Sequence, residues 1–498
     1  MDPVHNGFLR NLSLLQYGSP LIINNCGKCS SPQIRKKICS SSSFVKRFDT
    51  EHRLQAHRGC VNCINFSHEG DRLVSGSDDL KIVVWDWRKG EKVMSFQSQH
   101  QANVFQTKFM PGSMDTTIVS CARDGQVKVH LLSGHGEVSS KTLAKHKDSA
   151  HKLSVESDSP HVFMSCGEDG AVLQLDLRDS RATKKMLICK DDNNHKIPLY
   201  SIFTNPSNTN YFAISGRDQF ARIYDRRMAS AESPKMTPVK TFCPDHLKEA
   251  TDELLKANIT CLVYSHDGTE LLCSYNDEDI YLFDANHSSG SNYISKYTGH
   301  RNSATVKGVN FYGPKSEYVV SGSDCGNVFL WDKKSTDIVQ CVLGDHEGVV
   351  NCLEPHPYLP VLAVSGLDHD VKVFTPTADQ PTKLEDLSQK VEANKTARER
   401  ARDQEPLDPL EALLFRHIIR RYRRRLREFS ADGVEDDDDD DNDNDSDNSS
   451  GENSDTSSGD GGPYIVHDVM GDNHSSSDSD DSDTDRPPRR RIARCIQS

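Results

Sequence analysis

The sequence has no long apolar run and few hydrophobic residues for its length. No stretch approaches the roughly 18 apolar residues that a membrane-spanning helix needs. The N-terminal residues 1–23 are interrupted by Arg10 and Pro20, whereas a secretory signal needs a continuous apolar core. Hydrophobic residues make up 35% of the 498 residues, so part of the chain is expected to remain unfolded. We therefore expect a soluble, intracellular protein with no membrane partner.

Positive charge is missing from residues 435–485, which contain 20 Asp and Glu and no Lys or Arg. The whole chain carries −14, so the remainder carries about +6, the difference between −14 and −20. A segment this acidic cannot bury enough apolar surface to fold. We predict that residues 430–498 form a disordered acidic Ser/Asp tail with a basic C-terminus. Ser477, Ser479 and Ser482 stand beside acidic residues and suit an acid-directed kinase.

The sequence also lacks the motifs of common enzymes. It has no glycine-rich phosphate loop, no Ser-His-Asp spacing and no nucleophile elbow. Cys26 and Cys29 have the spacing of half a zinc site, but no second Cys or His pair follows at a useful distance. Cys63, Cys261 and Cys352 recur at one place in related stretches, which is typical of small core residues. We therefore predict a non-catalytic protein that needs no metal and no cofactor.

What the chain does contain is a repeat of seven related stretches, the first of which is "SGSDDLKIVVWD" (75–86). Six places before the position of Trp85 stands an aspartate in six of the stretches: Asp79, Asp124, Asp169, Asp218, Asp277 and Asp368. The sixth stretch has Cys325 there, with Asp324 one residue upstream. The first five aspartates recur at intervals of 45, 45, 49 and 59 residues, close to the length of a propeller blade.

Each unit has the same internal order of strands. An apolar strand is followed by a turn, a second strand, an aspartate turn, a third strand and a weaker outer strand. A histidine precedes the first strand in five units: His57, His100, His146, His300 and His346. Four-stranded units repeated seven times predict an all-β fold, a seven-bladed β-propeller over residues 43–376.

With a histidine before the first strand and a Trp-Asp pair after the third, the chain resembles the WD40-repeat family. The resemblance implies that the turn aspartates and the histidines form hydrogen bonds within the blade, where they fix the turn and take no part in catalysis. It also implies that an N-terminal strand completes the last blade. Residues 43–55 suit that role, because the seventh unit stops near Phe374 without a fourth strand.

Three arginines follow the Trp-Asp position at one register. Arg88 in "WDWR", Arg178 in "LDLR" and Arg227 in "YDRR" each stand two residues after the aspartate. Antiparallel strands alternate in direction, so these arginines are expected on the face opposite the aspartate turns. For any single one, a turn that favours Asp and Arg is the alternative. The pattern resembles the docking box of WD40 substrate receptors of cullin-4 RING ubiquitin ligases, which implies docking to the large adaptor subunit of damage-specific DNA-binding protein and to the cullin-4 ligase core.

The aspartate-turn face would then be free for an unknown protein substrate. The residues just before the turn aspartates are Arg123, Glu168, Arg217, Asn276 and Leu367. Their mixed charge favours a protein surface, since a nucleic-acid groove needs a consistent basic stripe, and we expect no direct binding of nucleic acid. On this interpretation the chain presents a protein for ubiquitination. The alternative is a WD40 scaffold outside any ligase, such as a histone- or chromatin-binding protein that uses its acidic tail.

The segments around the propeller are predicted from composition. We expect a mostly flexible N-terminal extension (1–42), an insertion with a short helix (228–257), a polar linker (377–404) and an Arg-rich amphipathic helix (405–429). In the last of these, apolar residues follow one another at helical spacing: Leu410, Leu414, Ile418 and Tyr422. The basic clusters at 420–427 and 486–494 resemble nuclear localisation signals, so we expect the protein in the nucleus and the cytoplasm.

Overall fold

The computed structural model describes residues 31–134, 136–156, 158–179, 183–229, 236–248, 257–346 and 348–403. The chain divides into two compact units, residues 1–403 with 490–498 and residues 404–489, and every described residue belongs to the first. The predicted Arg-rich helix, the acidic tail, both basic clusters and the Cys26–Cys29 pair lie outside the described residues. What we expect of them stays a prediction, and so does the histone-binding alternative.

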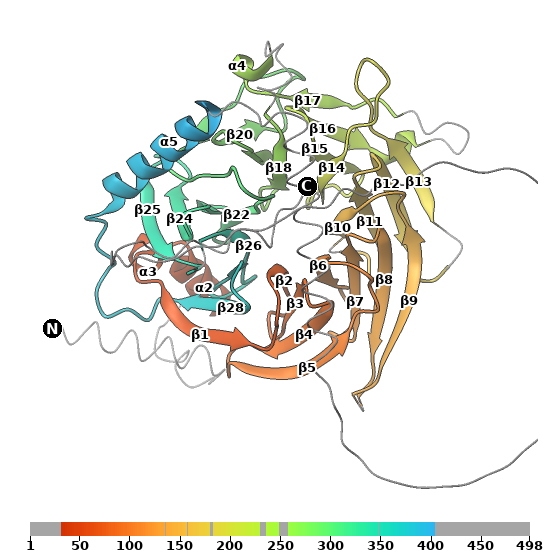
Figure 1. The fold of residues 1–498 in the computed structure, drawn as a ribbon, viewed down its shortest axis with the longest axis horizontal. Coiled ribbons are helices and arrows are strands. Elements are labelled where there is room, and N and C mark those ends of the chain that lie inside the picture. Colours follow the sequence, from red (N-terminus) through yellow and green to blue (C-terminus); the bar gives the residue numbers. More distant parts are fainter. Residues whose placement is uncertain are drawn as a thin grey trace, which may run out of the picture. The chain divides into compact units, whose positions relative to one another are not determined.

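Seven four-stranded antiparallel sheets stand around a common centre, each beside the next (Figure 1). Blades 1 to 4 are β2 (Val61–Phe66), β3 (Leu73–Ser77), β4 (Lys81–Asp86) and β5 (Glu91–Gln97); β6 (Val104–Phe109), β7 (Thr117–Ala122), β8 (Gln126–Leu132) and β9 (Val138–Lys145); β10 (Ala150–Val155), β11 (Val162–Gly167), β12 (Ala171–Asp176) and β13 (Lys184–Ile188); and β14 (Leu199–Thr204), β15 (Tyr211–Gly216), β16 (Ala221–Asp225) and β17 (Lys240–Phe242).

The remaining three sheets repeat this arrangement. They are β18 (Ile259–Tyr264), β19 (Glu270–Tyr275), β20 (Ile280–Asp284) and β21 (Ser295–Tyr297) in blade 5; β22 (Val309–Tyr312), β23 (Tyr318–Gly322), β24 (Asn327–Asp332) and β25 (Ile338–Leu343) in blade 6; and β26 (Val350–Pro355), β27 (Leu362–Gly366), β28 (Asp370–Thr375) and β1 (Asp49–Gln55) in blade 7. The predicted seven-bladed propeller is confirmed.

The ring is closed by the N-terminal strand. β1 pairs antiparallel with β28, for example Leu54 with Val371, so the last blade takes its fourth strand from the start of the chain. This is the closing strand that the sequence predicts, although it begins only at Asp49. Between the predicted start and that residue the chain forms the one-turn helix α3 (Ser42–Val45).

The core lies between neighbouring blades. Trp85 and Trp87 of blade 1 are fully buried and pack in one cluster with Leu54 and Val371 of blade 7. The inner three strands of each blade are covered on both faces, which requires near-continuous apolar runs. Outer strands such as β5 are largely exposed. The buried runs are the regularity that makes the repeat visible in the sequence.

The innermost strands share a β-bulge at their second residue. In β2, Val61 pairs with Ser77 and Cys63 with Gly76, which leaves Asn62 outside the register. Five other innermost strands, β6, β10, β14, β18 and β26, show the same shift. A bulge re-aims the side chain of the extra residue. Here the bulge residues line a small opening at the centre of the ring.

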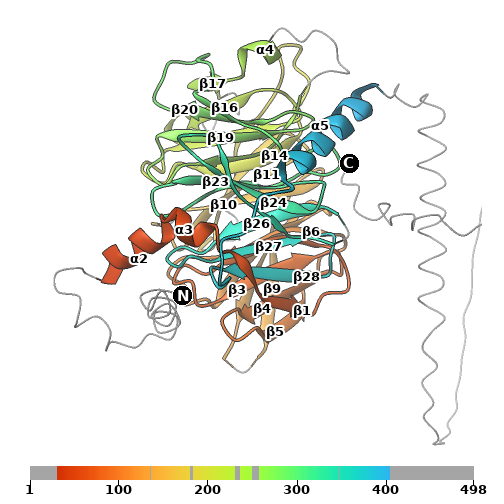
Figure 2. The ribbon, with the colours of Figure 1, turned by 90° about the vertical axis from the view of Figure 1, so that its left-hand side faces the viewer.

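Helices lie on both sides of the disc of blades. α2 (Ser31–Cys39) and α3 lie on one side and α5 (Leu387–Asp403) on the other, as Figure 2 shows. A 3₁₀ turn (Arg226–Met228) follows β16, and the one-turn helix α4 (Asp245–Lys248) lies in the predicted insertion. The predicted polar linker therefore contains a 17-residue helix, and the predicted flexible extension contains α2. None of the described helices is long and apolar enough to cross a bilayer.

Candidate functional site

In blades 1 to 3 a hydrogen-bonded network holds the turn aspartate. In blade 1, Asp79 Oδ2 lies 3.1 Å from His57 Nδ1, and it accepts a hydrogen bond from the backbone N–H of Arg58 at 3.0 Å. His57 Nε2 lies 2.8 Å from Ser75 Oγ, which also accepts a hydrogen bond from Trp85 Nε1 at 2.8 Å. The same aspartate, histidine and serine contacts recur in blades 2 and 3: Asp124, His100 and Ser120; Asp169, His146 and Ser165.

These networks keep the turn aspartates charged. Burial raises the pKa of Asp124 and Asp169, but hydrogen bonds from the histidine and from backbone N–H groups outweigh that effect and lower both values to about 2. A carboxylate fixed by several donors in this way holds the chain direction at the turn. In these three networks each aspartate and histidine is therefore engaged in holding the turn, and the geometry is structural.

The other predicted turn aspartates have different partners. Asp218 pairs with Arg222, Asp368 with Lys372 at 2.5 Å, and Asp277 accepts a hydrogen bond from Asn276 at 2.6 Å. The exposed His346 contributes only its backbone N–H, which donates to Asp368 at 3.1 Å. The histidine hydrogen bonds that the family resemblance implies are thus found in blades 1 to 3.

Blade 6 departs most, and the helix α5 compensates. Asp324 is almost fully buried and forms an ion pair with Lys307, whose side chain is also fully buried. Cys325 occupies the place of the usual aspartate. Asn394 of α5 donates its Nδ2 to the backbone oxygen of Gly299 at 2.8 Å and lies 3.5 Å from Cys325 Sγ. A side chain from outside the ring thus supplies the polar contact at this turn.

A second contact fixes the C-terminal half of α5. Arg398 Nη1 donates to Asp279 Oδ1 of blade 5 at 2.8 Å, and Lys296 pairs with the other oxygen of the same carboxylate at 2.8 Å. Leu387 at the N-terminal end packs on the hydrophobic cluster shared by blades 5 and 6. The helix therefore bridges the two blades beside the aspartate-turn face. Its contacts are largely polar, which explains why the sequence suggests only a linker.

Breaking the buried pair of blade 6 is expected to destabilise the fold. Replacing Lys307 by methionine leaves the buried Asp324 carboxylate with only its longer ion pair to Arg301, at 3.6 Å, and should cost about 3 kcal/mol of unfolding free energy. The double variant Lys307→Met, Asp324→Asn should recover part of that loss in urea denaturation. The Lys108→Met variant is the control, because its pair with Glu354 is partly exposed and should cost about 1 kcal/mol or less. Equal stability of single and double variants would contradict this account.

The arginines after the third strands lie on the opposite face. Arg178 donates Nε and Nη2 to the two oxygens of Asp176 at 2.9 and 2.6 Å, and Arg227 makes the same fork to Asp225 at 3.0 and 2.6 Å. Both side chains remain exposed, at 65% and 61%. The hydrogen bond from Arg178 is the main cause that lowers the pKa of Asp176 to about 2. Two guanidinium groups are thus held in one orientation on the adjacent blades 3 and 4.

Arg88 does not share this geometry. Its Nη1 donates to Asp71 Oδ1 at 2.5 Å, and its guanidinium stacks 5.0 Å from the ring centre of Trp87, which leaves it 29% exposed. The aspartate of its own turn, Asp86, pairs with Arg72 at 3.0 Å. The fully buried Trp87, whose Nε1 donates to a backbone oxygen, holds this turn differently. The three arginines that the sequence places together are therefore a matched pair and one exception.

Three of the five predicted substrate-face residues gather on blades 2 to 4. Glu168 accepts a hydrogen bond from His151 Nε2 at 2.6 Å. This hydrogen bond is the main cause that lowers the pKa of the Glu168 carboxyl, and the nearby Arg217 and Arg123 lower it further. Arg217 donates Nε to the hydroxyl of Tyr200 at 2.8 Å. Arg123 is exposed, and its guanidinium has no hydrogen bond or ion pair with a described residue.

The other two predicted residues are placed differently. Asn276 is half-buried and is engaged with Asp277. Leu367 is only 5% exposed and packs with Cys60 and Val349 in a small apolar cluster. The prediction that Leu367 belongs to the exposed substrate face is therefore wrong: its side chain is buried beneath the turn. An apolar residue at that register signals burial, whereas its polar counterparts face solvent.

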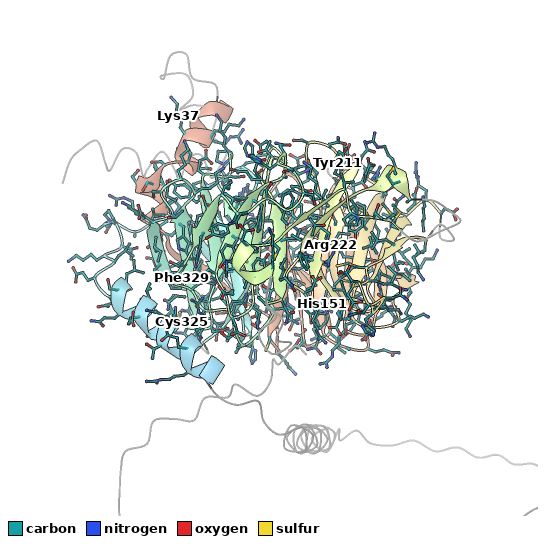
Figure 3. All side chains as sticks on the ribbon, turned by 90° about the horizontal axis from the view of Figure 1, so that it is seen from above. Lys37, His151, Tyr211, Arg222, Cys325 and Phe329 are labelled. Atoms are coloured by element: carbon teal, nitrogen blue, oxygen red, sulfur yellow. The ribbon has the colours of Figure 1, made fainter. Side chains whose placement is uncertain are left out.

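Sequence reasoning misses the residues at the centre of this face. The bulge residues and Lys307 form what we call the mouth ring, which borders an opening of about 30 Å³: Asn62, Phe105, His151, Tyr200, Thr260, Lys307 and Asn351. The rings of Phe105 and His151 stack at 4.9 Å, and Tyr200 meets His151 edge-on at 5.0 Å. Figure 3 shows His151 on the side that carries Cys325 and α5, opposite Lys37 of α2 and Tyr211. Aligning the second residue of each first strand would have found the ring.

Comparison with known proteins agrees with the repeat architecture. The family described as WD domain, G-beta repeat matches residues 48–86, 291–332 and 338–375. Each matched range runs from an outer strand through the three inner strands of the next blade. The fold is a seven-bladed β-propeller in which three repeats match the WD40 family. Among the described residues of this propeller, no group of three or more His, Cys, Asp or Glu side chains is placed to hold a metal ion.

Relatives of this chain include a protein named for its association with DDB1 and CUL4. The chain is 33% identical over 302 residues to Protein ALTERED SEED GERMINATION 2 of Arabidopsis thaliana, which covers 54% of this chain and 40% of that protein. It is 32% identical over 262 residues to human DDB1- and CUL4-associated factor 6 (51% and 30%) and 31% identical over 266 residues to human WD and tetratricopeptide repeats protein 1 (48% and 39%). The chain thus spans less than half the length of these relatives.

Proposed function

We propose that this chain is a substrate receptor of a cullin-4 RING ubiquitin ligase. The observation that carries the proposal is the matched pair Arg178 and Arg227, held by identical forks on adjacent blades of one face. A relative with 32% identity, named DDB1- and CUL4-associated factor 6, supports the same assignment. The partners are the large adaptor subunit of damage-specific DNA-binding protein, the cullin-4 core behind it and a protein substrate.

The fork geometry suits the docking of a protein partner. In each turn the aspartate takes up Nε and Nη2, so the guanidinium plane is oriented before the partner arrives and its remaining N–H groups point outward. Preorganised arginines lose little conformational entropy on binding, and they are enriched among the residues that dominate protein interfaces. The same face carries α2, whose Lys36 and Lys37 are exposed.

The catalytic contribution of such a receptor is proximity. With one face docked to the adaptor, the aspartate-turn face remains free for the substrate, and holding the two together raises the effective concentration of substrate lysines near the conjugating enzyme. The role requires no chemistry from the propeller itself and no cofactor. We propose that the protein works in both the nucleus and the cytoplasm.

A finer assignment within the family rests on the blade loops. Stretches such as "ANITCLVYSHDGTELL" and "ATVKGVNFYGPKSEYVVSGSDCG" resemble the eighth DDB- and cullin-4-associated factor. They include turns between strands as well as buried strands, and turns diverge faster than cores. We propose that the chain corresponds to this member.

The proposal is tested by purifying the full-length tagged chain from cells under low and moderate salt. The large adaptor and cullin-4 should co-purify in comparable molar amounts with the chain. A WD40 propeller with unrelated residues at the two fork positions serves as the control for non-specific capture. If neither ligase subunit is recovered with the folded chain, the ligase assignment is wrong.

A further inference from the structure

The opening on the aspartate-turn face is lined by the mouth ring and, one residue further along β10, by Lys152. The residue after the bulge in each innermost strand belongs to a second, lower ring of positions, of which Lys152 and Gly308 line the opening. Three of the lower residues are the register-matched Cys63, Cys261 and Cys352, and a fourth is Lys152. Neither ring contains a carboxylate. Between them they contain two lysines, Lys307 above and Lys152 below.

The two lysines differ in what compensates their charge. Lys307 is paired with Asp324, as described above. The Lys152 ammonium group forms no hydrogen bond or ion pair with any residue that the structure describes. The thiols of Cys261, Cys352 and Cys63 belong to blades 5, 7 and 1, yet they are near enough to act electrostatically on Lys152 of blade 3. The Lys152 side chain lines the central opening itself.

The surrounding thiols do not supply negative charge. Burial raises the pKa of the Cys63 thiol to about 12 and also raises the pKa of Cys352, so both are neutral at physiological pH. A cation withdrawn from bulk water is costly unless an anion accompanies it. Lys152 is thus a positive charge at the base of a small opening, with no counter-ion among the described residues.

The rim of the opening adds to this field. Glu168 is engaged by His151, and the Asp78 carboxylate accepts hydrogen bonds from the amides of Asn62 and Asn103. Arg123, by contrast, is exposed, and its guanidinium acts on Glu168 and Asp78 only at longer range, with no hydrogen bond or ion pair to a described residue. The acidic side chains nearby are therefore engaged by hydrogen-bond donors, while Arg123 at the rim and Lys152 at the base have no carboxylate hydrogen-bonded to them among the described residues. An opening of about 30 Å³ admits the end of one side chain and little more.

We propose that this opening binds the carboxylate of an acidic side chain in a protein ligand, with Lys152 as its counter-ion and Arg123 at the rim. The stacked Phe105 and His151 would pack against the methylene groups of that side chain. This deepens the proposed function, on which it rests for identifying the ligand as a ubiquitination substrate. It names a substrate class, proteins that expose an Asp or Glu able to enter a narrow opening.

The test uses degenerate peptide libraries on the immobilised full-length chain. Five libraries share random flanks and differ only in the fixed central residue: Asp, Glu, Asn, Gln or phosphoserine. The Asp or Glu library should be retained about tenfold more than the Asn and Gln libraries, because the neutral amides offer Lys152 no charge. The Lys152→Met variant should lose this preference. No ligase subunit is present, so the result is independent of whether the chain binds the ligase.

Two controls keep the outcome decisive. Lys141→Met removes an exposed lysine from the outer strand β9 and should leave the preference unchanged. Both variants are first checked for folding by thermal melting. Arg123→Gln changes an exposed residue and should leave the fold intact, so it should weaken the preference and can be measured even if Lys152→Met does not fold. Equal retention of acidic and amide libraries by the wild-type chain would overturn the proposal, as would an unchanged preference in both variants. Retention of phosphoserine without Asp or Glu would overturn the assignment to a carboxylate.

Discussion

Replacing Arg178 and Arg227 together by alanine is expected to reduce the co-purified adaptor and cullin-4 by about tenfold or more. The two guanidinium groups occupy equivalent positions on adjacent blades and are exposed, so a partner surface can engage both at once. Each is held by the aspartate of its own turn on the surface, so the substitutions leave the propeller core untouched. Quantitative mass spectrometry of the purified complex, normalised to the chain itself, measures the loss.

Arg88 supplies the matched control for this prediction. It stands at the same register, but its guanidinium is engaged by Asp71 and Trp87 and is less exposed. The Arg88→Ala variant should therefore lose much less adaptor than the double variant. All variants are compared with wild type by circular dichroism and thermal melting. Wild-type levels of adaptor on a folded double variant would show that the forks are not the docking residues.

The fold was predictable because its regularity is carried by buried residues. Each blade repeats apolar strands at fixed distances from an aspartate turn, and packing between blades permits little variation there. The same physics explains the misplaced Leu367. Its register position was correctly found, but an apolar side chain at a turn is as readily buried as exposed, and here it fills a gap beside Val349.

The helix α5 and the mouth ring escape sequence analysis for different reasons. α5 contacts the propeller through Asn394 and Arg398, whose partners are a backbone oxygen and a carboxylate. Such polar contacts leave no apolar stripe in the sequence from which the helix could be predicted. Six residues of the mouth ring occupy bulge positions, and Lys307 completes it. These residues pack on one another around the opening instead of filling a repeated place between blades, so the ring holds seven residues of six different types and no repeat is visible.

The difference between the three arginines also cannot be read from the sequence, because it depends on contacts that only the folded chain makes. "LDLR", "YDRR" and "WDWR" look equivalent in sequence, since each places an arginine two residues after an aspartate. Only the structure shows that Trp87, the second tryptophan of "WDWR", is buried in the core, where its Nε1 donates to the backbone oxygen of Gly70. The turn then lacks the fork, and the aspartate is free to pair with Arg72.

Acid is expected to unfold the propeller well above the pH at which its aspartates are protonated. Three histidines are buried as neutral rings: burial lowers the pKa of His300 to about 4 and that of His130 and His356 to about 3. In the unfolded chain a histidine titrates near 6.5. Between pH 6.5 and 4 the unfolded chain therefore binds more protons than the folded chain, so stability falls as pH falls.

The size of this effect follows from the same linkage. Each histidine contributes at most about 1.4 kcal/mol for each pH unit below 6.5, until its own folded pKa is reached. The turn aspartates reduce stability only at lower pH. Because the folded pKa values of Asp124 and Asp169 are about 2, their contribution to stability is lost only below about pH 4. Urea denaturation at pH 7.5, 6.5, 5.5 and 4.5 should show a small decline of the midpoint across the first pair, about 1 kcal/mol for the three histidines together, and a steep decline across the others.

A variant distinguishes the histidines from general charge repulsion. His300 has no hydrogen-bond partner on either ring nitrogen among the described residues, so His300→Gln removes the titration and disturbs few contacts. This variant should be less stable than wild type at pH 7.5 but lose less stability between pH 6.5 and 4.5. His195→Gln, at an exposed position, should retain the wild-type slope. If both variants decline as steeply as wild type, repulsion among surface cations is responsible and the buried neutral rings are not.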